Sequence, residues 1–172
     1  MKILVTNDDG VFSEGLRILA HTVEALGEVY VVAPDRERSA AAHSLTLHRP
    51  LRVEEIEPGV YAVDGTPVDC VNLAVYGILQ GHPDLVISGI NNGPNLGEDL
   101  VYSGTVSAAF EATFLGIPAF AISLAAREEF RYRIAADFAL QVATHITRVG
   151  QGIPDHDALL PNNHRAAHSK IV

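Results

Sequence analysis

Two adjacent carboxylates occur near the start of the chain, in Asn7-Asp8-Asp9-Gly10, directly after the apolar run Ile3-Leu4-Val5. Such a run is typical of a short buried strand, so we expect the carboxylates at its end. At an effective dielectric of about 20 and a separation of about 5 Å, their repulsion is roughly 3 kcal/mol. A divalent cation removes this repulsion because it takes both carboxylates as ligands. The segment therefore predicts a metal site at the carboxyl edge of a sheet.

The same segment has a simpler interpretation. Ser13 and Glu14 follow closely, so Asp8 and Asp9 can instead belong to a helix N-terminus or to an Asx turn. Adjacent residues of a strand also point to opposite faces of the sheet. The metal interpretation therefore requires the strand to end by about Asp8, and Gly10 allows the turn that would follow.

Two later loops carry polar side chains suited to the same chemistry. The first supplies Asp35, Arg36, Arg38, Ser39 and Ser44. We interpret its arginines as a solvated pair rather than as phosphate contacts. Carboxylate, amide and hydroxyl oxygens are the ligands that magnesium and manganese prefer.

The second loop, residues 88–105, is rich in glycine and asparagine. Asn91 and Asn95 offer neutral oxygens and amide donors, although taken alone each is more often a turn residue. Ser103 or Thr105 can cap the following helix, whose free backbone N–H groups suit a phosphate. Tyr102 either shapes the pocket or is a packed aromatic residue.

Strand-like and helix-like apolar patterns alternate along the chain. The expected strands are 3–6, 29–33, 85–87 and 117–124, and the expected helices are 16–26, 67–79, 105–115 and a long one over 130–146. This alternation predicts an α/β fold with a doubly wound, mostly parallel sheet. Short strands over 51–56 and 60–63 either extend the sheet or form a hairpin. Ligands of such sheets bind beyond the carboxyl ends of the strands, so we expect the three polar loops to meet there.

Composition restricts the class of protein. The 172 residues suffice for one domain with a core, and 48% of them are hydrophobic. A formal net charge of -9 argues against a basic face for nucleic acid or an anionic membrane. Cys70 is the only cysteine, which excludes an internal disulfide and indicates a packed, inert thiol. We find no signal peptide or membrane-spanning stretch, and we expect a cytoplasmic location.

Several motifs occur together between Met1 and about Leu124. They are Asn7-Asp8-Asp9-Gly10, Val32-Ala33-Pro34-Asp35 with Arg38-Ser39, Ser44-Leu45-Thr46, Gly65-Thr66-Pro67 with Asp69-Cys70, Ser88-Gly89-Ile90-Asn91 with Gly93 and Asn95, and Tyr102-Ser103-Gly104-Thr105-Val106. In order and spacing the chain resembles the SurE family of survival-protein nucleotidases, which are metal-dependent phosphatases acting on nucleoside monophosphates. The resemblance implies a Rossmann-like fold, a nucleoside monophosphate substrate and one divalent cation per subunit, magnesium or manganese.

The resemblance also implies roles for particular residues. The expected metal ligands are Asp8, Asp9, Ser39 and Asn91. The expected catalytic residues are Asp8, Asp9, Asn95 and Ser103, and the expected substrate contacts are Ser44, Gly104 and Thr105. We therefore expect a 5′-nucleotidase that releases nucleoside and phosphate.

The carboxyl end departs from the family pattern. Members of the family continue further, with more strands and an arm used in subunit pairing, whereas residues 151–172 are polar with little periodicity. We therefore expect one α/β domain over 1–150, an atypical tail over 151–172, a missing C-terminal part of the fold, and a homodimer or higher oligomer if the arm were present.

Three other functions deserve comparison. A haloacid-dehalogenase-type phosphatase would need two aspartates separated by one residue, and a serine hydrolase would need a Gly-x-Ser-x-Gly elbow. Neither pattern is present. The remaining alternative is a nucleotide-binding or regulatory module that keeps the metal site but lacks turnover.

Overall fold

The computed structural model describes residues 1–38, 43–125 and 131–150. The strands are β1 Lys2–Thr6, β2 Glu28–Pro34, β3 Val53–Glu57, β4 Val60–Val63, β5 Leu85–Asn92 and β6 Ala119–Leu124. The helices are α1 Glu14–Val23, α2 Pro67–Leu73, α3 Gly104–Phe114 and α4 Tyr132–Gly150, with 3₁₀ turns η1 Glu24–Leu26 and η3 Gly97–Val101 and a π-helical turn η2 Ala74–Ile78. None of these helices is long and apolar enough to cross a membrane.

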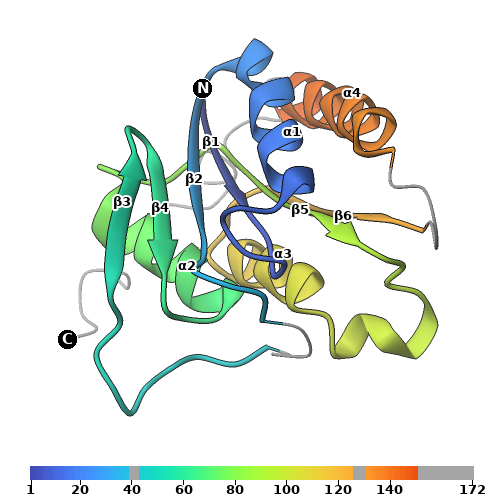
Figure 1. Ribbon diagram of the computed structural model, residues 1–172. Helices are drawn as coiled ribbons and strands as arrows, with labels where there is room; N and C mark the ends of the chain where they lie inside the picture. The colour runs from blue at the N-terminus through green and yellow to red at the C-terminus, as the bar shows by residue number, and fades with distance from the viewer. Residues whose placement is uncertain (39–42, 126–130, 151–172) are drawn as a thin grey trace, which may run out of the picture.

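The strands form a six-stranded sheet in the order β3-β4-β2-β1-β5-β6 (Figure 1). Every neighbouring pair is parallel except β3 and β4, which are antiparallel. The predicted α/β fold with a mostly parallel sheet is confirmed. The two short strands do both things expected of them, because they form a hairpin and β4 adds to the sheet beside β2.

Helices cover both faces of the sheet, and each face has its own apolar core. Figure 1 shows α1 and α4 together on one face, with α2 and α3 on the other. Side chains of β1 alternate between the two cores, with Ile3 and Val5 in one and Leu4 in the other. This alternation explains why the whole run is apolar, as expected for a strand that is buried on both sides.

The buried face of α4 is formed by small residues. Ala139 and Ala143 are fully buried, whereas Ile134 and Phe138 are 62% and 60% exposed. Ile134 and Phe138 therefore do not face the core, whereas Ile146 near the end of the helix packs against it. Alanine on the inner face allows α4 to approach α1 closely.

The order of the strands creates a crevice at the carboxyl ends of β1 and β5. From β1 the chain adds β2 and β4 on one side, and it then returns to add β5 and β6 on the other. Thr6 at the end of β1 lies opposite Ser88 in β5. Open α/β sheets bind ligands at such a reversal of strand order.

Candidate metal and phosphate site

A tight turn follows β1 and carries the paired carboxylates. Because β1 ends at Thr6, Asp8 and Asp9 lie beyond the strand, as the metal interpretation requires. The Asn7 side chain fixes the turn, since its Nδ2 donates to Ser13 Oγ at 2.7 Å and its Oδ1 accepts from the Gly10 N–H at 3.2 Å. Gly10 has φ +100°, a conformation that favours glycine.

The N-terminus of α1 is capped by Ser13 rather than by the carboxylates. Ser13 Oγ accepts the backbone N–H of Leu16 at 3.4 Å. The Asx-like contact in the turn is made by Asn7. Neither structural role proposed as the simpler interpretation therefore occupies Asp8 or Asp9.

Both carboxylates line a cavity of about 270 Å³ at the crevice. Its described lining residues are Asp8, Asp9, Glu37, Asn91, Asn92, Asn95, Asp99, Tyr102 and Ser103. They come from the turn after β1, the loop after β2, the end of β5, and the segment that leads into α3. The three polar loops therefore meet at one edge of the sheet.

Asp8 is held at the N-terminus of α3. It is only 7% exposed, and its Oδ1 accepts a hydrogen bond from the Thr105 hydroxyl. A Cβ on Gly104 would come within 2.9 Å of the Asp8 Cβ, so a larger residue there would displace the carboxylate. Burial raises the pKa of Asp8, and hydrogen bonds from the hydroxyl and backbone N–H of Thr105 partly offset this rise.

Asp9 connects the turn to the end of β5. Its Oδ2 accepts the backbone N–H of Asn92 at 3.0 Å. Burial raises the pKa of Asp9, and the nearby charge of Asp8 raises it further. Each carboxylate is therefore less easily charged here than in water, a condition that a bound cation would reverse.

The donor set fits a hard divalent cation. Asn91 lines the cavity beside the two carboxylates, and its Nδ2 donates to the Gly93 carbonyl at 2.9 Å, which leaves the amide oxygen for a ligand. Among the described lining residues there is no lysine, arginine or histidine. Among all the residues that the structure describes, no group of three or more His, Cys, Asp or Glu side chains could by itself hold a metal ion. A cation here would therefore need neutral oxygens as well as Asp8 and Asp9.

Asn95 and Ser103, the other two expected catalytic residues, also line this cavity. Asn95 Nδ2 donates to Ser123 Oγ at 2.7 Å, which fixes the amide against β6. Ser103 Oγ accepts the Val106 N–H at 3.2 Å and so caps α3. One of the two predicted caps, Ser103, therefore performs that function, while Thr105 bonds Asp8 instead.

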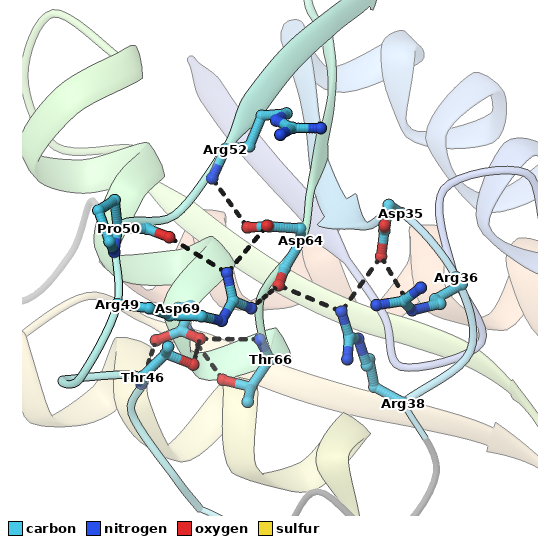
Figure 2. Close-up of polar contacts among 10 residues, drawn as sticks. All are labelled: Asp35, Arg36, Arg38, Thr46, Arg49, Pro50, Arg52, Asp64, Thr66 and Asp69. Carbon is cyan, nitrogen blue, oxygen red and sulfur yellow. Dashed lines mark hydrogen bonds and ion pairs between the residues drawn. The ribbon is translucent and has the colours of Figure 1, made fainter.

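The loop after β2 is fastened to β4 and α2 by polar contacts (Figure 2). The buried Asp69 carboxylate accepts the Thr46 N–H at 2.9 Å, the Thr46 hydroxyl at 2.7 Å and the Thr66 N–H at 2.8 Å. Ser44 is exposed and does not line the cavity; its carbonyl accepts the Thr66 hydroxyl at 2.7 Å. Ser39, the fourth expected ligand, lies outside the described residues.

Arg38 reaches both the turn and β4. Its backbone N–H donates to the Asp8 carbonyl at 2.7 Å, and its Nη2 donates to Asp35 Oδ1 at 3.3 Å and to the Asp64 carbonyl at 3.1 Å. Arg49 also donates to the Asp64 carbonyl, so two arginines hold the same peptide group (Figure 2). Arg38 is therefore a structural part of the loop rather than a solvated side chain.

Two carboxylates of the cavity were not predicted. Glu37 and Asp99 line it together with Asp8 and Asp9. Glu37 lies in the loop after β2 and Asp99 in the turn η3 after β5, and their position after a strand is the one signal the sequence holds for them. A single acidic residue in a loop is too common for that signal to distinguish them.

Comparison with known proteins agrees with this geometry. A family model described as "Survival protein SurE" matches residues 3–167. The chain is 56% identical over 163 residues to a 5′-nucleotidase SurE of Geotalea uraniireducens, covering 94% of this chain and 65% of that protein. It is 57% identical over 155 residues to a 5′-nucleotidase SurE of Geobacter sulfurreducens, covering 90% of this chain and 58% of that protein.

A solved structure is similar as well. The crystal structure of SurE protein from Aquifex aeolicus superimposes with a TM-score of 0.83 at 47% identity, covering 90% of this chain and 62% of that one. The chain thus spans less than two thirds of the length of each of these relatives.

Proposed function

The chain belongs to the SurE family, and on that premise we propose that it is a metal-dependent phosphatase that hydrolyses nucleoside monophosphates to nucleoside and phosphate. The observation that carries this proposal is the meeting of Asp8, Asp9 and Asn91 in one acidic cavity at the strand-order reversal. The relatives named 5′-nucleotidase support a 5′-phosphate as the group removed. No observation on the described residues favours a binding module without turnover.

Asp8, Asp9 and Asn91 would hold the divalent cation, with Ser39 as a further ligand. Oxygen-only coordination suits magnesium or manganese. A bound cation of this kind neutralises charge on the phosphoryl oxygens and makes an attacking water more acidic.

The protein's own groups fix the geometry of the reaction. Thr105 orients the Asp8 carboxylate, and the Asn92 backbone N–H orients Asp9. One of these two carboxylates accepts the proton of the water that attacks phosphorus in line with the leaving nucleoside oxygen. The raised pKa of each describes the metal-free site, and a bound cation would lower both values and keep the carboxylates charged.

Neutral donors would hold the phosphoryl oxygens. Asn95, fixed by Ser123, places an amide group in the cavity, and the N-terminus of α3 begins beside it at Ser103. Groups positioned before the substrate arrives stabilise the transition state without reorganisation. We assign Asn95 and Ser103 this role, and Gly104 the role of leaving room for Asp8.

The test is phosphate release from a nucleoside 5′-monophosphate in the presence of manganese. Asp8→Asn keeps the shape of the side chain and should lower turnover by about 100-fold or more. Asp137→Asn, an exposed carboxylate paired with Arg133 on α4, is the matched control and should retain wild-type turnover. Undiminished turnover of Asp8→Asn would overturn the proposal.

Three further properties follow from the family resemblance. We propose that residues 1–150 form one α/β domain, that the protein resides in the cytoplasm, and that subunits carrying the C-terminal arm of the family pair as a homodimer or higher oligomer. Sedimentation at several concentrations, with and without such an arm added to this chain, tests the oligomeric state. A monomer at all concentrations when the arm is present would contradict it.

A further inference from the structure

An exposed tyrosine forms part of the wall of the acidic cavity. Tyr102 lines the cavity, yet it is 64% exposed. Its backbone is held on both sides, because its N–H donates to the Asp99 carbonyl at 3.0 Å and the next residue, Ser103, caps α3. Tyr102 is therefore not a packed aromatic residue; it is an exposed lining residue of the cavity on a fixed backbone.

The cavity is small and open. Pockets that enclose drug-sized ligands typically measure about 300–1,000 Å³, whereas this one measures about 270 Å³ and also has to hold a cation. A phosphoryl group and its cation would occupy much of this volume, so the nucleoside would extend toward the solvent, on the side of the exposed Tyr102.

The charge of the cavity gives a second reason. Four carboxylates line it, namely Asp8, Asp9, Glu37 and Asp99, and the described lining residues include no basic side chain. Among the described lining residues, only a bound cation and neutral hydrogen-bond donors could attract a dianionic phosphate. Further affinity for the substrate has to come from its uncharged part, the nucleoside.

The segment before Tyr102 carries further exposed apolar side chains, namely Leu96, Leu100 and Val101. A nucleobase presents a flat face that stacks well on an aromatic ring, whatever the identity of the base.

We propose that Tyr102 stacks on the nucleobase of the substrate and so makes the site prefer nucleoside monophosphates over sugar phosphates, with little discrimination among bases. This inference rests on the proposed function, because it assumes that the phosphate of the same molecule occupies the cavity. Tyr102 is thereby assigned the role of a specificity-determining residue at the edge of the site.

The experiment compares kcat/KM for adenosine 5′-monophosphate with kcat/KM for ribose 5-phosphate, which lacks the base. Base–aromatic stacking predicts that Tyr102→Ala lowers this ratio about tenfold, whereas Tyr102→Phe keeps the ring and should keep the ratio. Tyr76→Ala removes another exposed tyrosine, which is 70% exposed and is not among the described lining residues, and should leave the ratio unchanged. An unchanged ratio in Tyr102→Ala would overturn the proposal.

The Tyr102→Phe variant separates stacking from hydroxyl chemistry. If its ratio falls as far as that of Tyr102→Ala, the hydroxyl group and not the ring makes the contact, and the stacking proposal is wrong.

A binding measurement keeps this inference distinct from the proposed function. Calorimetric titration with adenosine needs neither turnover nor cation. If the base stacks on Tyr102, the dissociation constant for adenosine should be about tenfold higher in Tyr102→Ala than in the wild type. If the wild type releases phosphate from neither ester with manganese, the phosphatase proposal fails, while the adenosine titration still decides the role of Tyr102. Equal adenosine affinity in wild type and Tyr102→Ala would contradict stacking of the base on Tyr102.

Discussion

The hydroxyl of Thr105 at the start of α3 donates a hydrogen bond to Asp8 after β1, joining residues 97 positions apart in the chain. The bond ties the carboxylate to a helix N-terminus, where the macrodipole favours negative charge. Asp8 is thus oriented by the fold itself, because both partners of the bond are buried.

Removal of this bond should weaken metal binding more than it weakens the fold. Thr105→Val preserves the shape of the side chain but leaves Asp8 without its hydroxyl donor, whereas Thr105→Ser retains the donor. Loss of a partner that orients a metal ligand typically costs 10–100-fold in metal affinity. We expect a loss of about tenfold for Thr105→Val in a manganese titration followed by electron paramagnetic resonance. Equal affinity of the valine and serine variants would contradict this role.

The raised pKa values of Asp8 and Asp9 predict the pH dependence of the metal-free protein. Their folded pKa values lie above the ordinary value of 3.8, so between the two values the folded state binds more protons than the unfolded state. By linkage, stability falls as pH rises through that window and then becomes level. Urea unfolding in the presence of chelator, measured from pH 4 to pH 8, tests this.

The same reasoning predicts that Asp8→Asn stabilises the metal-free protein. The neutral amide keeps an oxygen for Thr105 but carries no buried charge, and we expect a gain of roughly 1 kcal/mol at pH 7. Manganese should stabilise the wild type and leave this variant almost unchanged, since ligands stabilise only the state that they bind. A variant less stable than the chelated wild type would contradict the raised pKa of Asp8.

Asp69 should be important for stability, since it fixes the loop after β2. Asp69 is 2% exposed, and its carboxylate accepts hydrogen bonds from Thr46 and Thr66. Asp69→Ala leaves these donors unsatisfied, and we expect a loss of about 2–3 kcal/mol in the free energy of unfolding. Thr46→Val removes one of the same bonds and should cost about 1 kcal/mol. Equal stability of wild type and Asp69→Ala would show that the loop is held by other contacts.

The order of elements could be predicted from apolar periodicity, but two features depended on long-range contacts. β5 was expected to end at Ile87, yet it continues to Asn92 because Asn91 and Asn92 pair with Ser123 and Leu124 of β6. The local sequence, rich in glycine and asparagine, predicts a loop. Pairing with β6 holds the same residues in an extended conformation.

The site was predictable where several loops shared one chemistry. Asp8, Asp9 and Asn91 could be grouped because their loops follow strands of one sheet, and the structure brings them into one cavity. Glu37 and Asp99 could not be grouped in the same way, since their proximity depends on the path of the loop after β2 and on the position of η3. The bond between Thr105 and Asp8 was likewise hidden, because a threonine at a helix start reads as a cap.

The inner face of α4 provides a test of packing. Ala139 is fully buried against the core, so Ala139→Leu should overfill it and cost about 1–3 kcal/mol. Phe138→Ala removes a much larger side chain, but one that is mostly exposed, and should change stability by less than about 0.5 kcal/mol. Chemical unfolding of the two variants measures both. The reverse ranking would mean that the large apolar residues face the core.

Diffraction from crystals grown with manganese and phosphate tests the metal site most directly. We predict an anomalous peak in the cavity at coordination distance from oxygens of Asp8, Asp9 and Asn91, with phosphate density beside it on the side of Asn95 and Ser103. An empty cavity at saturating manganese, or a peak bound elsewhere with these three residues uncoordinated, would contradict the account.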